Sequence, residues 1–244
     1  MKNFSIVIYL FIVSVVSAQQ KICKTSILNK NNLFEKNEIT KYQKYDFSKL
    51  WTHTDNNAVF GVIGDNYERI LIKLISIKKD LKNQNEYVIY GKSQVKGNIC
   101  DFTGTITITK IQEIKNPSFG NDDEYKDQGI KSQGLLTAKY KFIENKTQKS
   151  TGDFEGTLQT IWYLDKNNSM RYNDIDINSD SYFNNAFVGT WKSDSSQKMK
   201  LCNWGDYRVP NVNCDFDIGA AEVSVSDKYK KNGWLAMPKI NWWK

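Results

Sequence analysis

The chain has 244 residues, 40 % of them hydrophobic, and a formal net charge of +7 at pH 7. This apolar content suffices for a full hydrophobic core, so the fold need not depend on metals or on many disulfides. The lysines are interspersed with acidic residues and form no block of like charge, which argues for a solvated basic surface and against a nucleic-acid partner.

Residues 1–18 have the pattern of a cleaved signal peptide. Lys2 precedes a mostly apolar run from Phe4 to Val16, and Ser17 and Ala18 supply small residues at the cleavage position. The run is shorter than the roughly 18–20 residues that a membrane-spanning helix needs. We therefore predict export to the periplasm or the medium, with no membrane span in the mature chain.

The rest of the sequence predicts an all-β protein. Residues 19–57 are polar and weakly patterned, and we interpret them as an N-terminal extension that wraps the domain. Residues 58–244 are predicted to form a single β domain with a loop-rich, aromatic C-terminal tail. The fold class is an antiparallel meander barrel or a two-sheet sandwich, because strand patterns alternate with polar turns. Strands are expected at 69–77, from 87, at 99–109, 135–143, 154–164 and 170–177, and from 187, with a long exposed loop at 115–129.

The motif Phe-x-Gly-Thr occurs three times, beginning at Phe102, Phe154 and Phe187. Each copy stands near the start of an alternating strand pattern. We predict that all three Phe side chains are buried. The glycines are expected to let a neighbouring backbone or an aromatic ring approach closely.

Four cysteines, an even number in a chain predicted to be exported, favour disulfides. Cys202 and Cys214 lie close together around a loop that contains a proline, so we predict one bond between them. The second predicted bond then joins Cys23 to Cys100. The paired short spacings of a structural zinc site are absent, and we expect no metal and no cofactor.

The most unusual segment runs from Cys202 to Glu222. A disulfide-closed loop would display aromatic and arginine side chains rigidly, as binding sites do. A second segment, at 64–69, has a similar composition. In the alternative interpretation each arginine pairs with a nearby aspartate and Trp204 is buried. The candidate ligand-binding residues are Trp204, Asp206, Tyr207, Arg208, Tyr67 and Arg69.

Three functions are compatible with this pattern. His53 is the only histidine, which removes most Ser-His-Asp and Cys-His schemes. The leading hypothesis is a non-enzymatic exported binding protein for a small molecule, a glycan or a protein. One alternative is a glycan-processing enzyme that uses carboxylates among Asp215, Asp217 and Glu222. Another is an inhibitor or immunity protein that neutralises a secreted toxin or enzyme.

The third motif copy continues as Gly189-Thr190-Trp191, which resembles the Gly-x-Trp strand of lipocalin-like and streptavidin-like barrels. The resemblance implies a barrel whose interior takes a small ligand and whose end is closed by Trp191. Those families carry the motif on their first strand, whereas here it lies late in the chain. The whole chain also looks like exported proteins of Bacteroidetes-type bacteria, a resemblance that implies no activity.

Overall fold

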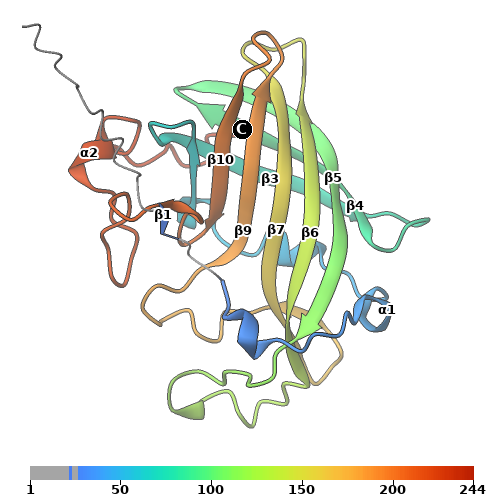
Figure 1. Cartoon of the computed structure of the whole chain (residues 1–244). Coiled ribbons are helices and arrows are strands. Elements are labelled where there is room, and N and C mark those ends of the chain that lie inside the picture. Colours follow the sequence, from blue (N-terminus) through green and yellow to red (C-terminus); the bar gives the residue numbers. More distant parts are fainter. Residues whose placement is uncertain (1–21, 24–26) are drawn as a thin grey trace, which may run out of the picture.

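The computed structural model describes residues 22–23 and 27–244, and the predicted signal peptide lies outside them. Within these residues eight antiparallel strands close into an up-and-down barrel (Figure 1). Each strand pairs with the next one along the chain, and the last, β10, pairs with the first, β2. The all-β antiparallel meander is confirmed, and it is a barrel rather than a sandwich. The barrel strands are β2 (Val59–Ile63), β3 (Glu68–Lys79), β4 (Glu86–Val95), β5 (Asn98–Glu113), β6 (Ser132–Glu144), β7 (Gly152–Leu164), β9 (Asn184–Ser193) and β10 (Met199–Asp206).

Short elements surround the barrel. A three-residue strand, β8 (Met170–Tyr172), extends the sheet beside the end of β7, and β1 (Ile22–Cys23) pairs with β11 (Val212–Asn213) in a separate two-stranded sheet. Within the described ranges, no helix is long and apolar enough to cross a membrane. The helical segments are η1 (Lys30–Asn32), α1 (Ile39–Tyr42), η2 (Ser48–Trp51), η3 (Asn56–Ala58), η4 (Asn121–Asp123) and α2 (Asp227–Lys230).

The three Phe-x-Gly-Thr motifs lie on β5, β7 and β9, and their Phe side chains point into the barrel. Phe102 and Phe154 are each 1 % exposed and Phe187 is 3 % exposed, so the predicted burial is confirmed. Gly156 lies directly opposite Gly189 in the β7–β9 pair. A Cβ atom at either glycine would come within 3 Å of the Tyr140 hydroxyl. The two glycines therefore let this buried tyrosine reach the barrel wall.

The middle of the barrel is filled by aromatic rings. Trp204 of β10 stacks on Phe187 of β9, with ring centroids 4.6 Å apart. Tyr140 packs edge-on against both of them, at 5.2 Å and 5.3 Å. Phe142 and Phe154 complete the cluster. This cluster separates the two ends of the barrel from each other.

One end of the barrel is closed by the N-terminal segment. Phe47, Leu50 and Trp51 belong to the same buried cluster as the barrel interior. The Trp51 indole donates a hydrogen bond to Thr160 Oγ1 at 3.1 Å, and the backbone N–H of Phe47 donates one to Tyr87 Oη at 3.1 Å. Residues 47–51 thus plug what we call the closed end. The opposite end, where the β4–β5, β6–β7 and β9–β10 turns lie, is called the open end.

The disulfide pairing predicted from the sequence is wrong. The structure joins Cys23 to Cys214, with Cα atoms 4.8 Å apart, because the pairing of β1 with β11 brings these residues together. Cys202 is fully buried among the barrel core residues and cannot reach Cys214 outside. Cys100 and Cys202 are both free thiols. Cysteine spacing along the chain was misleading because strand alternation turns Cys202 inward.

Candidate ligand-binding site

A cavity of about 340 Å³ lies at the open end of the barrel. Each of the eight barrel strands contributes at least one residue to its lining. The β6–β7 and β9–β10 hairpins extend beside each other at this end (Figure 1). The walls combine apolar side chains, such as Ile63, Ile70 and Val95, with polar and charged ones, and the aromatic cluster lies beneath. A site built on strands rather than on loops holds its lining residues in fixed positions.

Glu144 is the buried carboxyl group of this cavity. It is the last residue of β6 and only 4 % exposed. The Ser93 hydroxyl donates a hydrogen bond to Oε1. The Trp191 indole N–H and the backbone N–H of Gly152 donate to Oε2, at 3.0 Å and 2.9 Å. Donors from three other barrel strands, β4, β7 and β9, thus fix the orientation of this carboxyl group.

Burial raises the pKa of Glu144, and the three hydrogen bonds oppose this effect only in part. No basic side chain within the described residues forms an ion pair with it. A buried carboxylate without a cationic partner gains stability from any further hydrogen-bond donor. The site therefore favours a ligand that brings a hydroxyl or amine group to Glu144.

The rim of the cavity carries two lysines held in place by neighbours. Lys96, in the β4–β5 turn, forms an ion pair with Glu68 at 2.5 Å. The Lys200 ammonium lies over the Trp191 ring, 5.5 Å from its centroid. Trp191 therefore contacts both the rim and the buried carboxyl. The free thiol of Cys100 also lines the cavity.

The sequence-predicted loop around Trp204 is not a surface site. Trp204 lies on β10 inside the barrel and is 2 % exposed, so the expected display on an exposed loop is wrong. Strand alternation explains its position, since Cys202, Trp204 and Asp206 all face inward. Tyr207, the next residue, adopts a positive φ of 68° and packs against Tyr182. Trp204 is therefore part of the hydrophobic core and not of a surface.

Arg208 and Tyr67 are buried in a second hydrophobic region outside the barrel wall. The Arg208 guanidinium forms an ion pair with Asp217 at 2.5 Å and donates to the backbone carbonyls of residues 219–221. Tyr67 packs against Phe216 and Tyr229. These contacts support the alternative interpretation, in which the arginine and tyrosine stabilise the chain itself. Arg69, on the outer face of β3, contacts the C-terminal tail.

Asp206 lies at the closed end, buried in a polar network. Its Oδ2 accepts hydrogen bonds from Thr54 Oγ1 at 2.7 Å, from Asn185 Nδ2 at 2.7 Å and from Tyr172 Oη at 3.0 Å. Thr54 precedes β2, whereas Tyr172 and Asn185 belong to β8 and β9. Burial raises the pKa of Asp206 to about 7. The network ties the N-terminal segment to the barrel.

Asp206 predicts a pH dependence of stability. In the folded chain it keeps its proton up to about pH 7, whereas in the unfolded chain it loses it near its ordinary pKa of 3.8. The folded state therefore binds more protons between these values, and this group's contribution to stability falls as the pH rises from about 4 to 7. We expect Asp206→Asn to gain stability relative to the unmodified chain across this window. Urea denaturation of both proteins as a function of pH measures the difference, and a difference that does not change with pH would contradict the assignment.

Two of the three carboxylates considered for glycan processing, Asp215 and Asp217, are paired with basic side chains. Asp217 binds Arg208, and Asp215 binds Lys228 at 2.7 Å and the Tyr229 hydroxyl at 2.9 Å. His53 stacks on Tyr172 and lies 3.6 Å from Asp174. Among the residues that the structure describes, no group of three or more His, Cys, Asp or Glu side chains is arranged to hold a metal ion. This arrangement gives the enzyme hypothesis no support.

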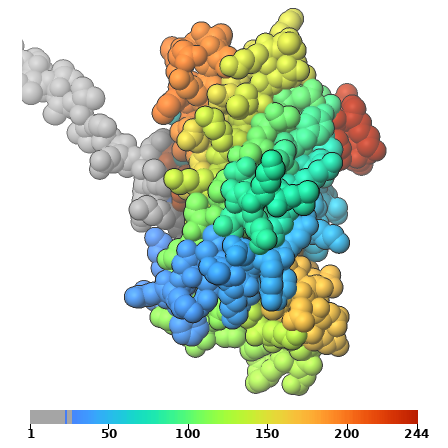
Figure 2. All heavy atoms as spheres, turned by 90° about the vertical axis from the view of Figure 1, so that its right-hand side faces the viewer, coloured from blue at the N-terminus to red at the C-terminus, as the bar shows by residue number. Residues whose placement is uncertain are grey.

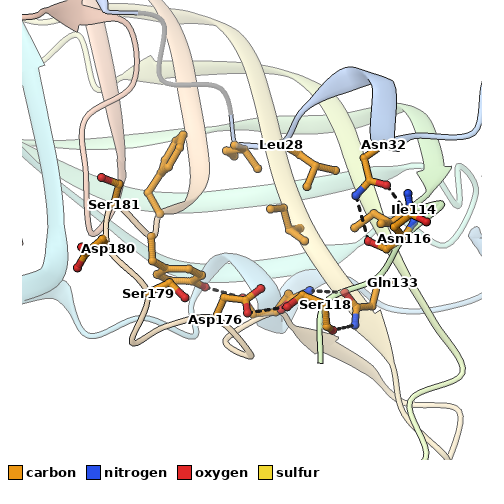
Figure 3. A pocket seen from close by; sticks show the side chains of 15 residues that line it. Leu28, Asn32, Ile114, Asn116, Ser118, Gln133, Asp176, Ser179, Asp180 and Ser181 are labelled. Atoms are coloured by element: carbon orange, nitrogen blue, oxygen red, sulfur yellow. Dashed lines mark hydrogen bonds between the residues drawn. The ribbon is translucent and has the colours of Figure 1, made fainter. Parts of the chain in front are cut away.

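A larger cavity of about 450 Å³ lies outside the barrel wall, beside the loop after β5 and the segment after β8. Figure 3 shows that its polar side chains bond to one another. The Ser118 hydroxyl donates to Asp176 at 2.7 Å, and the Asn32 amide donates to the carbonyl of Asn116 at 3.1 Å. Its lining comes mainly from loops. The cavity at the open end is the better candidate, because a buried carboxyl without an ionic partner faces it.

Sequence reasoning missed Glu144, Ser93 and Trp191 as site residues. The signal for Glu144 was present, since Leu136, Ala138, Tyr140 and Phe142 alternate inward and Glu144 continues the series. The predicted strand ended at 143, one residue before it. Comparisons of the chain with protein families, with curated proteins and with solved structures found no match.

Proposed function

We propose that this chain is an exported binding protein that takes a small, mainly apolar molecule bearing a hydroxyl or amine group into the open end of its barrel. The observation that carries the proposal is the Glu144 carboxyl, held by hydrogen bonds in a cavity that is lined by all eight barrel strands and has both apolar and polar walls. Export rests on the predicted signal peptide and agrees with the Cys23–Cys214 disulfide.

The size and lining of the cavity define the class of ligand. A volume of about 340 Å³ lies at the lower end of the range of small-molecule sites. Ile63, Ile70 and Val95 would pack against an apolar ligand body. A chain-like lipid that threads the whole barrel is disfavoured, because the aromatic cluster beneath leaves it no path. Of what the lipocalin-like resemblance implies, the proposal therefore keeps only a ligand site, placed at one end of the barrel.

The hydrogen bonds of Glu144 define the polar group of the ligand. Each carboxylate oxygen can accept two hydrogen bonds. Oε2 already accepts two, whereas Oε1 accepts one, from Ser93, among the described residues. A hydroxyl or amine of the ligand would donate the second hydrogen bond that Oε1 can accept. A ligand carboxylate has no N–H or O–H to donate to this oxygen.

The fluorescent probe N-phenyl-1-naphthylamine tests the proposal, because it is apolar and has one N–H donor. We expect its fluorescence to rise on binding. Val95→Trp fills the cavity and should weaken binding at least tenfold. Val88→Trp is the matched control, because Val88 lies on the same strand but is 50 % exposed on its outer face. Glu144→Gln should weaken binding of the amine more than that of the corresponding ether, which lacks the N–H.

Two results would overturn the proposal. In one, the probe does not bind to the folded protein at all. In the other, Val95→Trp and Val88→Trp bind the probe equally well, which would place the probe elsewhere. Circular dichroism melting of each variant separates a loss of binding from a loss of fold.

A further inference from the structure

The C-terminal tail, residues 231–244, is held firmly against the outer face of the barrel. The backbone N–H of Arg69 donates to the carbonyl of Asn232 at 2.8 Å, and its guanidinium donates to the carbonyl of Ala236 at 3.0 Å. The same guanidinium lies 4.9 Å from the centre of the Trp234 ring, whose N–H donates to the carbonyl of Tyr67 at 2.9 Å. The start of the tail therefore has a defined position on β3.

Large apolar side chains of this anchored tail nevertheless point into solvent. Leu235 is 74 % exposed, Met237 73 % and Ile240 93 %, all within a short segment. Trp242 is only 8 % exposed, and Trp243 lies beneath the ammonium of Lys73. The tryptophans thus contact the protein, whereas the three aliphatic side chains are largely exposed to solvent, and Met237 and Ile240 also border a hollow beside residues 55–57. In Figure 2 the end of the tail, in red, projects from the body of the molecule at the right-hand edge.

The sequence around these exposed side chains is rich in lysine. Residues 227–244 contain five lysines and one acid, Asp227, which is paired with Lys230 at 2.6 Å. Lys231, Lys239 and Lys244 are exposed and form no ion pair within the described part of the chain. Asp55 lines a hollow of about 490 Å³ between residues 237–243 and the barrel, so an anion would be disfavoured inside that hollow. Anionic groups are therefore expected over the outer tip of the tail.

We propose that the tail is an interfacial anchor that binds the protein to an anionic phospholipid bilayer. Exposed aliphatic side chains insert at the boundary between headgroups and acyl chains, and lysines attract anionic headgroups. A second copy of the chain is a poorer occupant, because symmetric pairing of two tails would bring like charges together. The proposal is independent of the ligand site at the open end.

Co-sedimentation with lipid vesicles tests this anchor. The exported protein is used, so that no apolar leader contributes to binding. We expect it to sediment with vesicles of phosphatidylglycerol and phosphatidylethanolamine and to remain in solution with phosphatidylcholine vesicles. The triple variant Leu235→Ser, Met237→Ser, Ile240→Ser should bind at least tenfold more weakly. Its matched control replaces Leu81, Met199 and Ile218 with serine, since these are also 66–98 % exposed but lie elsewhere on the chain.

Charge is tested separately, because binding through lysines weakens with salt. Lys231→Gln, Lys239→Gln, Lys244→Gln should reduce binding severalfold, and added salt should do the same to the unmodified protein. The proposal is overturned if the protein ignores anionic vesicles, if it binds neutral vesicles equally well, or if the serine triple variant binds as the control does. Sedimentation of the protein without vesicles measures whether it forms a dimer. A dimer that only the tail variant abolishes would identify a second copy as the occupant and reject the bilayer.

Discussion

Replacing Trp204 with alanine is expected to lower the free energy of unfolding by about 3–5 kcal/mol. The indole is 2 % exposed and lies between Phe187, Tyr140 and Phe154 in the middle of the barrel. Truncation removes these contacts and leaves a void that the surrounding strands cannot fill, because they are fixed by the closed sheet. Urea denaturation followed by circular dichroism measures the loss.

Trp243→Ala is the control for this prediction. Trp243 lies in the tail beneath Lys73, outside the barrel, and its loss should cost no more than about 1 kcal/mol. Probe binding at the open end should survive Trp243→Ala unchanged. A Trp204→Ala protein as stable as the unmodified chain would contradict the structure and would reopen the interpretation of Trp204 as an exposed recognition residue.

Removing the disulfide is expected to lower the free energy of unfolding by about 3–5 kcal/mol. Cys23 and Cys214 are separated by 191 residues, so the bond restricts nearly the whole unfolded chain. In the chain-entropy treatment a loop of this length corresponds to about 5 kcal/mol, and measured losses are often smaller. Urea denaturation of Cys23→Ala, Cys214→Ala beside the unmodified protein gives the value.

A reductant provides the internal control for the disulfide. It should destabilise the unmodified protein and leave the double variant unaffected, because Cys100 and Cys202 are already free thiols. Alkylation under denaturing conditions without reductant should label two cysteines. Labelling of none, which the pairing inferred from the sequence requires, would show that the structure assigns the bonds wrongly.

The alternating strand patterns made the all-β fold predictable. The parts that could not be predicted depend on which side chains become neighbours in the folded chain. Ile106 and Ile108 alternate with threonines, and both are buried as the pattern indicates. The same alternation places Trp204 and Glu144 inside, whereas a bond between Cys202 and Cys214, which the sequence predicts, would make the segment around Trp204 a loop. Whether two cysteines meet depends on which strands become neighbours. That information is absent from their spacing.

The candidate site could not be predicted from the sequence for a related reason. Ser93, Glu144 and Trp191 lie on β4, β6 and β9 and share no motif. A buried glutamate at the end of an apolar strand resembles an ordinary strand terminus until the barrel closes and brings a hydroxyl and an indole to it. The residues that precede Arg69 and Arg208 make these arginines stand out in the sequence. Their partners, such as Asp217 for Arg208, only became evident in three dimensions.

Closure of the barrel by β10 against β2 has a consequence for how the protein is made. Cys202 of β10 lies opposite Ile63 of β2, so the seam joins residues from distant parts of the chain. Folding that depends on such non-local pairing is slow, on the order of milliseconds to seconds. Until β10 is in place, the edge of β2 that pairs with it lacks its partner and is able to capture other chains. The newly made chain therefore depends on being kept from aggregating until β10 has been synthesised, and truncation before residue 199 would leave this edge permanently unpaired.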